Sequence, residues 1–230
     1  MRSAADPVQV LIDKLVAYPQ DPSLLTIEQT RSLIRDISAL FRLHLGRNGV
    51  PARTITRMTT KFRDAGRRSA PWKPTSSRVP GLPQDGADGN RISRWLLPSD
   101  HEFYADERTA TLAEVRYYLQ TLSMEGAPPL PTEQLRRHFQ AILGHELRPG
   151  AFLDPIQKAP VLFQEFVRSA RYVESGHIVP LSRGGRHNYG NATLMLKESN
   201  RLQSDRTVQE LLVLLTNILQ NQGFTVTRNH

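Results

Sequence analysis

The chain has 230 residues, no cysteine, a formal net charge of +8 and 39% hydrophobic residues. These values exclude a disulfide framework and a thiolate metal site, and they allow an ordinary globular core. No run approaches the roughly 20 apolar residues that span a bilayer, and the start MRSAADPVQV lacks an apolar signal region, so we expect a cytoplasmic protein that does not contact a membrane.

The first part of the chain is predicted to be helical. Apolar residues at the spacing of one helix face predict helices over residues 7–18 and from about Thr26 to Leu45. Thr26 and Gln29 have the spacing of a capping box, which satisfies backbone donors at a helix start. Residues 52–64 are predicted to form a short basic helix.

Positive charge is concentrated in residues 31–80. This block holds twelve Lys and Arg against two acids, Asp36 and Asp64, so its charge is +10 and the other 180 residues sum to −2. Such a block is typical of a surface that contacts phosphates, and a solvated helix face followed by a basic loop is the alternative.

Residues 65–100 have no sustained hydrophobic period and are rich in Pro, Gly, Ser and Arg, which predicts a long loop. Long loops inside compact chains are often functional, and we expect this one to contact DNA. Among its residues are Trp72, Lys73, Arg78, Arg91, Arg94 and Trp95. Three further helices are predicted over residues 110–122, 132–145 and 159–172.

Residues 172–207 read YVESGHIVPLSRGGRHNYGNATLMLKESNRLQSDRT and carry the most informative pattern. A first strand is predicted to end at Pro180, because proline cannot donate to a strand ladder. A glycine-punctuated loop, a second strand over 191–196 and a helix over 197–203 follow. The predicted order is therefore strand, loop, strand, helix.

This segment resembles the HNH nuclease family, whose ββα-metal motif has spaced His, Gly-Gly, Asn and Asn or His positions. The matching residues are His177 followed by Ile-Val-Pro, the pair Gly184 and Gly185, Asn191 and Asn200. The resemblance covers about 36 residues.

The resemblance implies a role for each of three residues. His177 would be the general base that takes a proton from the attacking water, which suits an imidazole. Asn191 would orient the His177 ring and fix the loop. Asn200 would bind a divalent cation, Mg²⁺ or Mn²⁺, one per active site, where the metal neutralises developing charge. A core histidine and two turn or cap asparagines are the alternative.

One position departs from the family pattern. The residue before the base is usually an acid or a histidine that binds the metal, and here it is Gly176. Alternate strand residues share a face, so Glu174 lies on the side of position 176, and the glycine would leave it room to reach forward. We predict that Glu174 is the substitute ligand, with an exposed strand glutamate as the alternative.

Further residues are candidates for binding DNA. His187 lies in the loop, where it could contact a phosphate, assist the metal or cap a turn. The cations near the motif and in the basic block would contact backbone phosphates without reading sequence. They are Arg183, Arg186, Arg201, Arg206, Arg53, Arg57, Lys61, Arg67, Arg68 and Arg94.

The sequence predicts an α+β fold, a mostly helical chain with a C-terminal ββα-metal motif. We expect residues 1–150 to form a helical, loop-rich region for DNA recognition and dimerisation, and residues 151–230 the nuclease region. Thr207 and Glu210 have capping-box spacing for a last helix through about Gln222. Its broad apolar face needs a partner, and the chain's own core is favoured over a second subunit.

A compact chain with this motif near its end resembles type II restriction endonucleases, in particular the group that cuts CATG-centred palindromes. That resemblance implies double-stranded DNA as substrate, a homodimer, and products with 5′-phosphate and 3′-hydroxyl ends. No protein partner is evident. The alternatives are a homing-type or nonspecific HNH nuclease, a secreted nuclease toxin, and a non-catalytic DNA-binding protein that has lost its metal.

Overall fold

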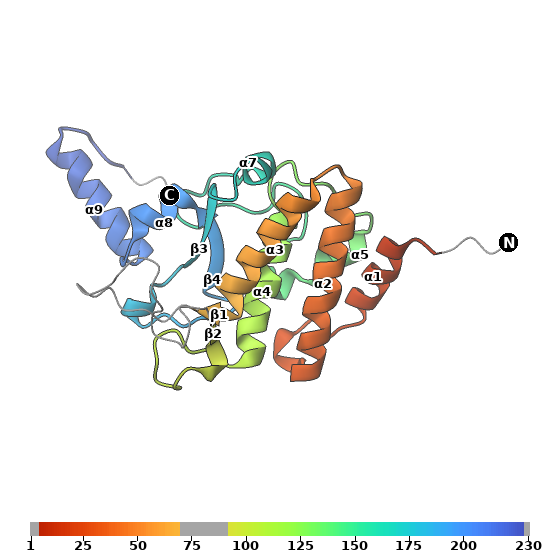
Figure 1. The fold of residues 1–230 in the computed structure, drawn as a ribbon. Coiled ribbons are helices and arrows are strands. Elements are labelled where there is room, and N and C mark those ends of the chain that lie inside the picture. Colours follow the sequence, from red (N-terminus) through yellow and green to blue (C-terminus); the bar gives the residue numbers. More distant parts are fainter. Residues whose placement is uncertain (1–4, 70–91, 228–230) are drawn as a thin grey trace.

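The computed structural model describes residues 5–69 and 92–227 and mixes helices with small antiparallel sheets (Figure 1), which confirms the α+β class. The elements are α1 (Pro7–Val16), η1 (Pro22–Leu24), α2 (Ile27–Arg47), α3 (Ala52–Gly66), β1 (Arg68–Ser69), β2 (Ile92–Ser93), η2 (Arg94–Leu96), α4 (Glu107–Leu122), α5 (Glu133–His138), α6 (Gln140–Leu143), α7 (Phe163–Arg168), β3 (Val173–His177), η3 (Leu181–Arg183), β4 (Ala192–Leu196), α8 (Lys197–Gln203) and α9 (Val208–Asn221).

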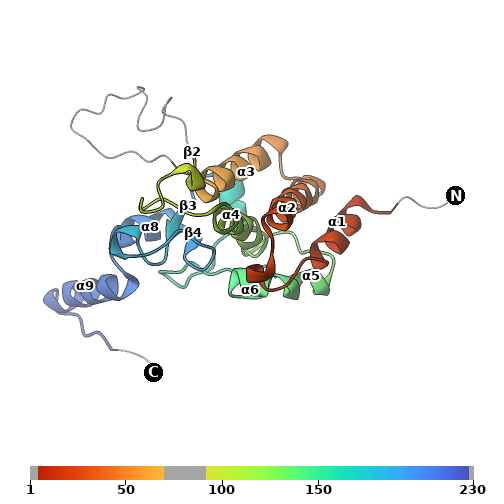
Figure 2. The ribbon, with the colours of Figure 1, turned by 90° about the horizontal axis from the view of Figure 1, so that it is seen from below.

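Helix α4 is the centre of the fold. All residues from Ala110 to Leu122 are buried, so the helix has no solvent-facing side. It packs against α2 and α3 on one side and against β4 and α6 on the others (Figure 2). Because both the helical part and the β3–β4 sheet use α4 as their support, the position of the sheet is fixed by the helical core.

The hydrophobic core continues across residue 150. The ring centroids of Phe62 of α3 and Phe166 of α7 lie 6.2 Å apart, and Leu194 of β4 belongs to the same buried cluster. Residues from both 1–150 and 151–230 therefore share one hydrophobic core. The recognition and nuclease roles expected for these two regions remain predictions.

Both predicted capping boxes are present. The Thr26 amide donates to Gln29 Oε1 at 2.9 Å and the Gln29 amide to Thr26 Oγ1 at 3.1 Å. At the start of α9, the Thr207 amide donates to Glu210 Oε2 at 2.8 Å and the Glu210 amide to Thr207 Oγ1 at 3.2 Å. These two helix starts were predictable because the signal lies within four residues.

Two predicted helices differ from the structure. The expected helix over 132–145 breaks at Phe139 into α5 and α6, and α6 ends at Gly144 in the left-handed conformation. The expected helix over 159–172 shrinks to the six residues of α7, because Pro160 and Leu162 form isolated β-bridges instead. In the second case tertiary pairing overrides an apolar spacing that favours a helix.

The expected loop over 65–100 begins and ends with regular structure. Strands β1 and β2 pair with Arg68 opposite Ser93, and η2 follows. Trp72, Lys73, Arg78 and Arg91 lie outside the described residues, so the DNA-contacting role expected for this loop stays a prediction for them.

The predicted strand–loop–strand–helix order over 172–207 is present. Strands β3 and β4 pair antiparallel, with Val173 opposite Leu196 and His177 opposite Ala192, and α8 follows β4 directly. Buried Asp154 fixes this junction by accepting hydrogen bonds from the Leu196 amide at 2.7 Å and from Ser199 Oγ at 2.7 Å. The start of α8 is therefore held firmly against the sheet.

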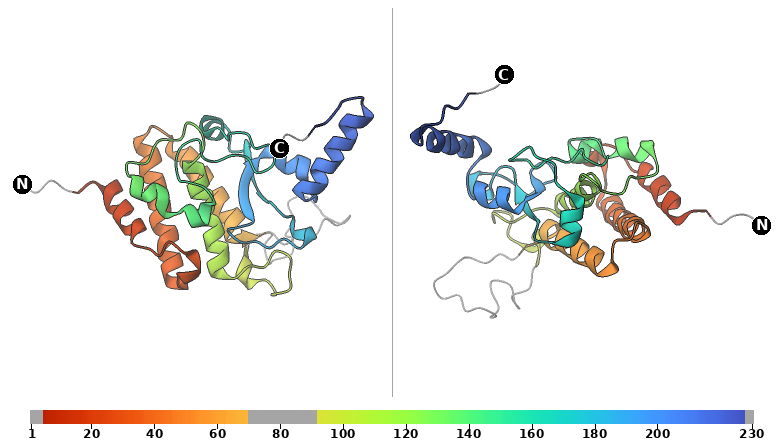
Figure 3. Two further views of the ribbon diagram at one scale, coloured as in Figure 1. Left: turned by 180° about the vertical axis from the view of Figure 1, so that it is seen from behind. Right: turned by 90° about the horizontal axis from the view of Figure 1, so that it is seen from above.

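Helix α9 projects from the body (Figure 3), and most of its apolar side chains are uncovered. Leu211 is its one buried residue within the described chain. The exposed apolar side chains of the helix are Leu212, Val213, Leu214, Ile218 and Leu219. The expectation that the apolar face of α9 packs on the chain's own core is wrong, because α9 contacts α8 and buries Leu211, yet these five side chains stay exposed. Among the described residues, no helix is long and apolar enough to cross a bilayer.

Candidate active site

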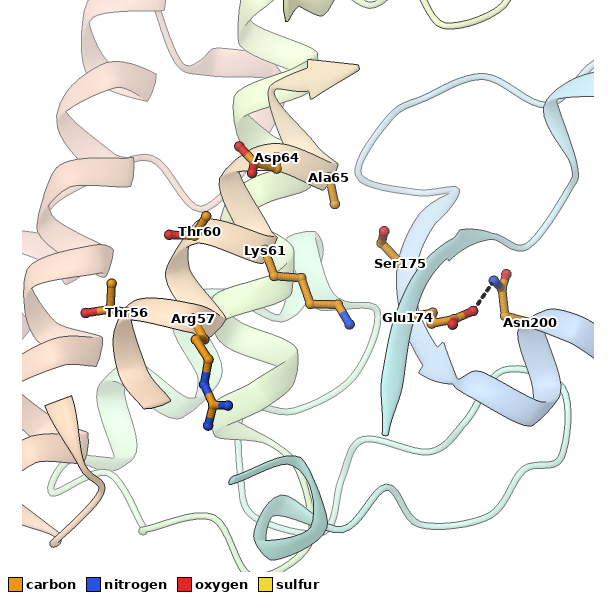
Figure 4. Close-up of a pocket in the computed structure, with 9 residues that line it drawn as sticks. All are labelled: Thr56, Arg57, Thr60, Lys61, Asp64, Ala65, Glu174, Ser175 and Asn200. Carbon is orange, nitrogen blue, oxygen red and sulfur yellow. Dashed lines mark hydrogen bonds between the residues drawn. The ribbon is translucent and has the colours of Figure 1, made fainter. Parts of the chain in front are cut away.

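Two adjoining pockets open where α3, β3 and α8 meet. The first has a volume of about 570 Å³ and lies between α3 and the pair Glu174 and Asn200 (Figure 4). The second, of about 470 Å³, contains His177 together with Asn200. Ser175 and Asn200 line both pockets. Asn200 thus connects the predicted base to the predicted carboxylate ligand.

Glu174 and Asn200 form a polar pair. Asn200 Nδ2 donates to Glu174 Oε2 at 2.8 Å, and both side chains are half-buried. A Cβ added to Gly176 would lie 2.7 Å from Asn200 Oδ1 and 2.8 Å from Met195 Sδ. The space beside Gly176 is therefore filled by the Asn200 amide and Met195, and an acid at position 176 would displace them.

The donor set of this pair fits a hard divalent cation. A carboxylate and a carboxamide oxygen are ligands that Mg²⁺ accepts, and Mg²⁺ usually keeps several waters beside one or two protein ligands and substrate phosphates. No cluster of three His, Cys, Asp or Glu occurs within residues 5–69 and 92–227. Glu174 and Asn200 therefore suit a hydrated Mg²⁺ better than a cage built entirely from protein ligands.

His177 ends β3 and forms a hydrogen-bonded chain with His187. Its Nε2 lies 2.9 Å from His187 Nδ1, and His187 Nε2 lies 2.8 Å from the carbonyl oxygen of Gly66. His187 is 1% exposed, so this chain runs into the interior. Gly66 belongs to the last turn of α3, where carbonyls lack helical partners and attract donors.

Burial holds both imidazoles in the neutral form. Desolvation, with the nearby Arg94 charge, lowers the pKa of His177 to about 4. The same two causes, followed by the His177 charge, lower the pKa of His187 well below its usual value. His177 is therefore unprotonated at neutral pH and able to accept a proton.

Asn191 fixes the loop between the two strands. Its Oδ1 accepts from the Val179 amide at 2.7 Å, and its Nδ2 donates to the carbonyls of Val179 at 2.9 Å and Arg186 at 3.0 Å. These bonds join the two ends of the loop. None of them reaches His177, whose ring partner in the described chain is His187.

Helix α3 forms the cationic wall of the first pocket. Arg57 and Lys61 line it, and Figure 4 shows Lys61 extending toward Glu174. Lys61 Nζ donates to the carbonyls of Ala170 and Val173, so this side chain also holds the start of β3. Arg53 and Arg57 are exposed on the same helix, and both are open to a polyanion.

Three residues expected to bind phosphates are committed to the protein itself. Arg94 is 6% exposed and donates to the carbonyls of Gly66, Ala65 and Phe103, closing the end of α3. Arg67 is ion-paired with buried Glu114. His187 is buried against His177. The expected phosphate contacts of Arg94 and His187 are therefore corrected to contacts within the fold, whereas for Arg67, which is partly exposed, phosphate contact stays a prediction.

Five further predicted cations are exposed or half-buried. Arg186 and Arg201 are exposed, and Arg68 and Arg206 are half-buried. Arg183 is exposed and donates to the Asp205 carbonyl at 3.1 Å. All five remain candidates for phosphate contact.

Several supporting residues were missed. Buried Gln120 of α4 donates to Thr193 Oγ1 at 2.7 Å and accepts from the Leu194 amide at 2.9 Å, which fixes β4. Arg116, also on α4, donates to the Tyr189 carbonyl and supports the loop. Polar residues within an otherwise apolar helix were the available signal, because buried polar groups require partners.

The fold has a solved counterpart. A crystal structure described as that of a type II restriction endonuclease matches with a TM-score of 0.51 and 20% sequence identity, over 80% of this chain and 82% of that chain. The sequence matches no protein-family model and no curated protein. The likeness therefore extends to most of the fold.

Proposed function

We propose that this chain is a divalent-metal-dependent type II restriction endonuclease of the HNH kind, acting on double-stranded DNA. The observation that carries the proposal is the convergence of His177, Glu174 and Asn200 on two adjoining pockets of a β–loop–β–α unit. The shared fold with a type II restriction endonuclease supports it. The products would be 5′-phosphate and 3′-hydroxyl ends.

His177 acts as the general base in this proposal. Its imidazole takes a proton from a water whose oxygen forms a bond to phosphorus, while the bond to the 3′ oxygen breaks and that oxygen is protonated by solvent. Because the His177 pKa is lowered to about 4, the ring is neutral before the reaction and ready to accept the proton. Asn191 keeps the loop closed around the base.

Glu174 and Asn200 would hold Mg²⁺ or Mn²⁺ through their side-chain oxygens, one ion per active site. When bound, such an ion neutralises the charge that develops on the phosphate oxygens. Asn200 must turn its amide or release Glu174 to present its oxygen, since Nδ2 donates to that carboxylate.

The DNA backbone would lie along the exposed cations of α3 and of the β3–β4 loop. The exposed cations are Arg53, Arg57, Arg183, Arg186 and Arg201, and Arg57 lines the first pocket. Contacts of this kind supply affinity and register without reading bases.

The enzyme would act as a homodimer on a palindrome, and a CATG-centred site is the finer proposal. The uncovered apolar face of α9 supports dimerisation, since Glu210 is the one charged residue of the helix and apolar faces of this width need a partner. Light scattering at micromolar concentration tests it. A dimer that Leu212→Glu and Ile218→Glu convert to monomer is expected, and a wild-type monomer contradicts it.

The function is tested by incubating plasmid DNA with the chain, with and without Mg²⁺. Discrete fragments that require the metal are expected, and sequencing their ends gives the site and the polarity. A smear would favour a nonspecific HNH nuclease, and cutting at very few sites would favour a homing-type enzyme. DNA binding without cutting under Mg²⁺ or Mn²⁺ would overturn the enzymatic proposal in favour of a non-catalytic DNA-binding protein.

A further inference from the structure

His177 and His187 are joined by a hydrogen bond whose direction follows from the atom at the far end of the chain. His187 Nε2 faces the Gly66 carbonyl at 2.8 Å. A carbonyl oxygen only accepts, so Nε2 of His187 must carry a hydrogen. A neutral imidazole has one N–H, which leaves Nδ1 of His187 as an acceptor.

The acceptor on His187 determines the protonation of His177. His177 Nε2 lies 2.9 Å from His187 Nδ1, so it must be the donor in that bond. The hydrogen of neutral His177 is then on Nε2, and the lone pair is on Nδ1. Within the described residues, Nδ1 of His177 has no hydrogen-bond partner, and the His177 side chain lines the second pocket.

We propose that His187 is a positioning residue that fixes the tautomer and ring orientation of His177, so that Nδ1 is the basic atom presented to the water. The role of His187 in catalysis rests on the proposed nuclease function, whereas the hydrogen-bonded chain itself does not.

The environment of His187 supports this role. It is 1% exposed, and its pKa is lowered well below the usual value by burial and by Arg94, so it stays neutral and keeps one N–H. The Gly66 carbonyl is held in place by packing, since a Cβ on Gly66 would lie 2.6 Å from Glu114 Cβ. Arg94 Nε also donates to this carbonyl at 2.9 Å. The Gly66 carbonyl, where the hydrogen-bonded chain ends, is thus fixed by α4 and by Arg94, both distant from His187 in sequence.

The matched variants are His187→Gln and His187→Phe. A Gln amide carries an acceptor and a donor on one carbon, so it can accept from His177 and donate to Gly66. Phe fills the space but offers neither group, which leaves a buried N–H on His177 without a partner. The hydrogen of His177 is then expected to move to Nδ1, where the pocket can solvate it.

The experiment is nitrogen NMR of the full chain with ¹⁵N-labelled histidine at pH 7. In the wild type and His187→Gln, His177 is expected to be protonated on Nε2 alone, and in His187→Phe its Nδ1–H form should increase. A wild-type His177 protonated on Nδ1 overturns the proposal, as does an unchanged tautomer in folded His187→Phe. If that variant does not fold, the wild-type spectrum alone decides.

Cleavage kinetics give the second readout. His187→Phe is expected to lower kcat about 10- to 100-fold with little change in KM, as loss of a residue that orients a catalytic histidine does, and His187→Gln should recover most of it. Equal losses in both variants would overturn the positioning role. A wild type that shows the Nε2–H tautomer but never cuts DNA would instead refute the proposed function and leave the tautomer assignment intact.

Discussion

Strand β3 carries two polar pairs with opposite surroundings. Glu174 and Asn200 are half-buried beside an open pocket lined by Arg57 and Lys61. His177 pairs with His187, which is 1% exposed and lies against the end of α3. We call Glu174 and Asn200 the wet pair, because both side chains line an open pocket and offer oxygen ligands. We call His177 and His187 the dry pair, because its inner member, His187, is fully buried.

Metal binding and proton transfer are thus assigned to two side chains of β3 that lie only three positions apart, Glu174 and His177. A hydrated cation needs exchangeable water and oxygen ligands, which the Glu174 side provides. A base must remain unprotonated in one orientation, and the buried His187 side provides that. The following predictions test whether the two pairs divide the work in this way.

The largest effect is expected from removing the base. His177→Ala should lower kcat by about 10²- to 10⁴-fold, the usual contribution of a positioned acid or base, because no imidazole remains to take the water proton. The measurement is single-turnover cleavage of a supercoiled plasmid with saturating Mg²⁺.

The matched control for His177→Ala is DNA affinity measured without metal. It should change little, since His177 is not among the exposed cations. Retained cleavage with lost binding would mean that His177 serves recognition and not catalysis.

The next effect concerns the wet pair. Glu174→Gln removes a charge but keeps the shape, and it should weaken apparent Mg²⁺ affinity in cleavage by about 10- to 100-fold. Glu198→Gln is the control, because Glu198 is exposed on the same helix as Asn200. Unchanged Mg²⁺ dependence in Glu174→Gln would transfer the ligand role to Glu102 or Asp205, the acids that line the His177 pocket.

Local signals were read correctly from the sequence, and distant partnerships were not. The bounds of β4 and α8 and the Thr207 capping box follow from a few adjacent residues. The partner of His187 is Gly66, 121 residues away, and nothing near either residue indicates the other. The sequence likewise predicts phosphate binding for Arg94, because only the fold shows that this side chain closes the end of α3.

Gly176 tests the wet pair from the backbone side. The sequence predicts that Glu174 reaches into the space that the glycine leaves, whereas in the structure Asn200 and Met195 fill that space. Gly176→Ala should therefore push the Asn200 amide away and lower cleavage about 10-fold. Gly46→Ala is the control, since a Cβ there meets nothing within 4 Å. Full activity of Gly176→Ala would mean that the Glu174–Asn200 bond is dispensable.

The dry pair predicts a pH dependence of stability. Folding lowers the His177 pKa from about 6.5 to about 4, so the unfolded chain binds the proton more readily. The stability that neutral, buried His177 contributes is therefore fully present above pH 6.5, and it is lost as the pH falls from 6.5 toward 4. Urea unfolding should show wild type losing on the order of 1–2 kcal/mol more than His177→Ala between pH 7.5 and 5. Equal losses would mean that His177 is not buried in solution.

The smallest effect is expected on the cationic rim of the wet pair. Arg57 is exposed in the α3 wall, so Arg57→Ala should weaken DNA binding a few-fold, equally for all sequences, and reduce the slope of log affinity against log salt by about 1. Arg137→Ala is the control, because Arg137 is 74% exposed on α5 and pairs with Glu133. If both variants bind DNA like the wild type, the duplex does not follow α3. If Arg57→Ala abolishes binding of one sequence only, Arg57 reads a base. The first pocket, which Arg57 lines, then contributes to specificity as well as to the chemistry.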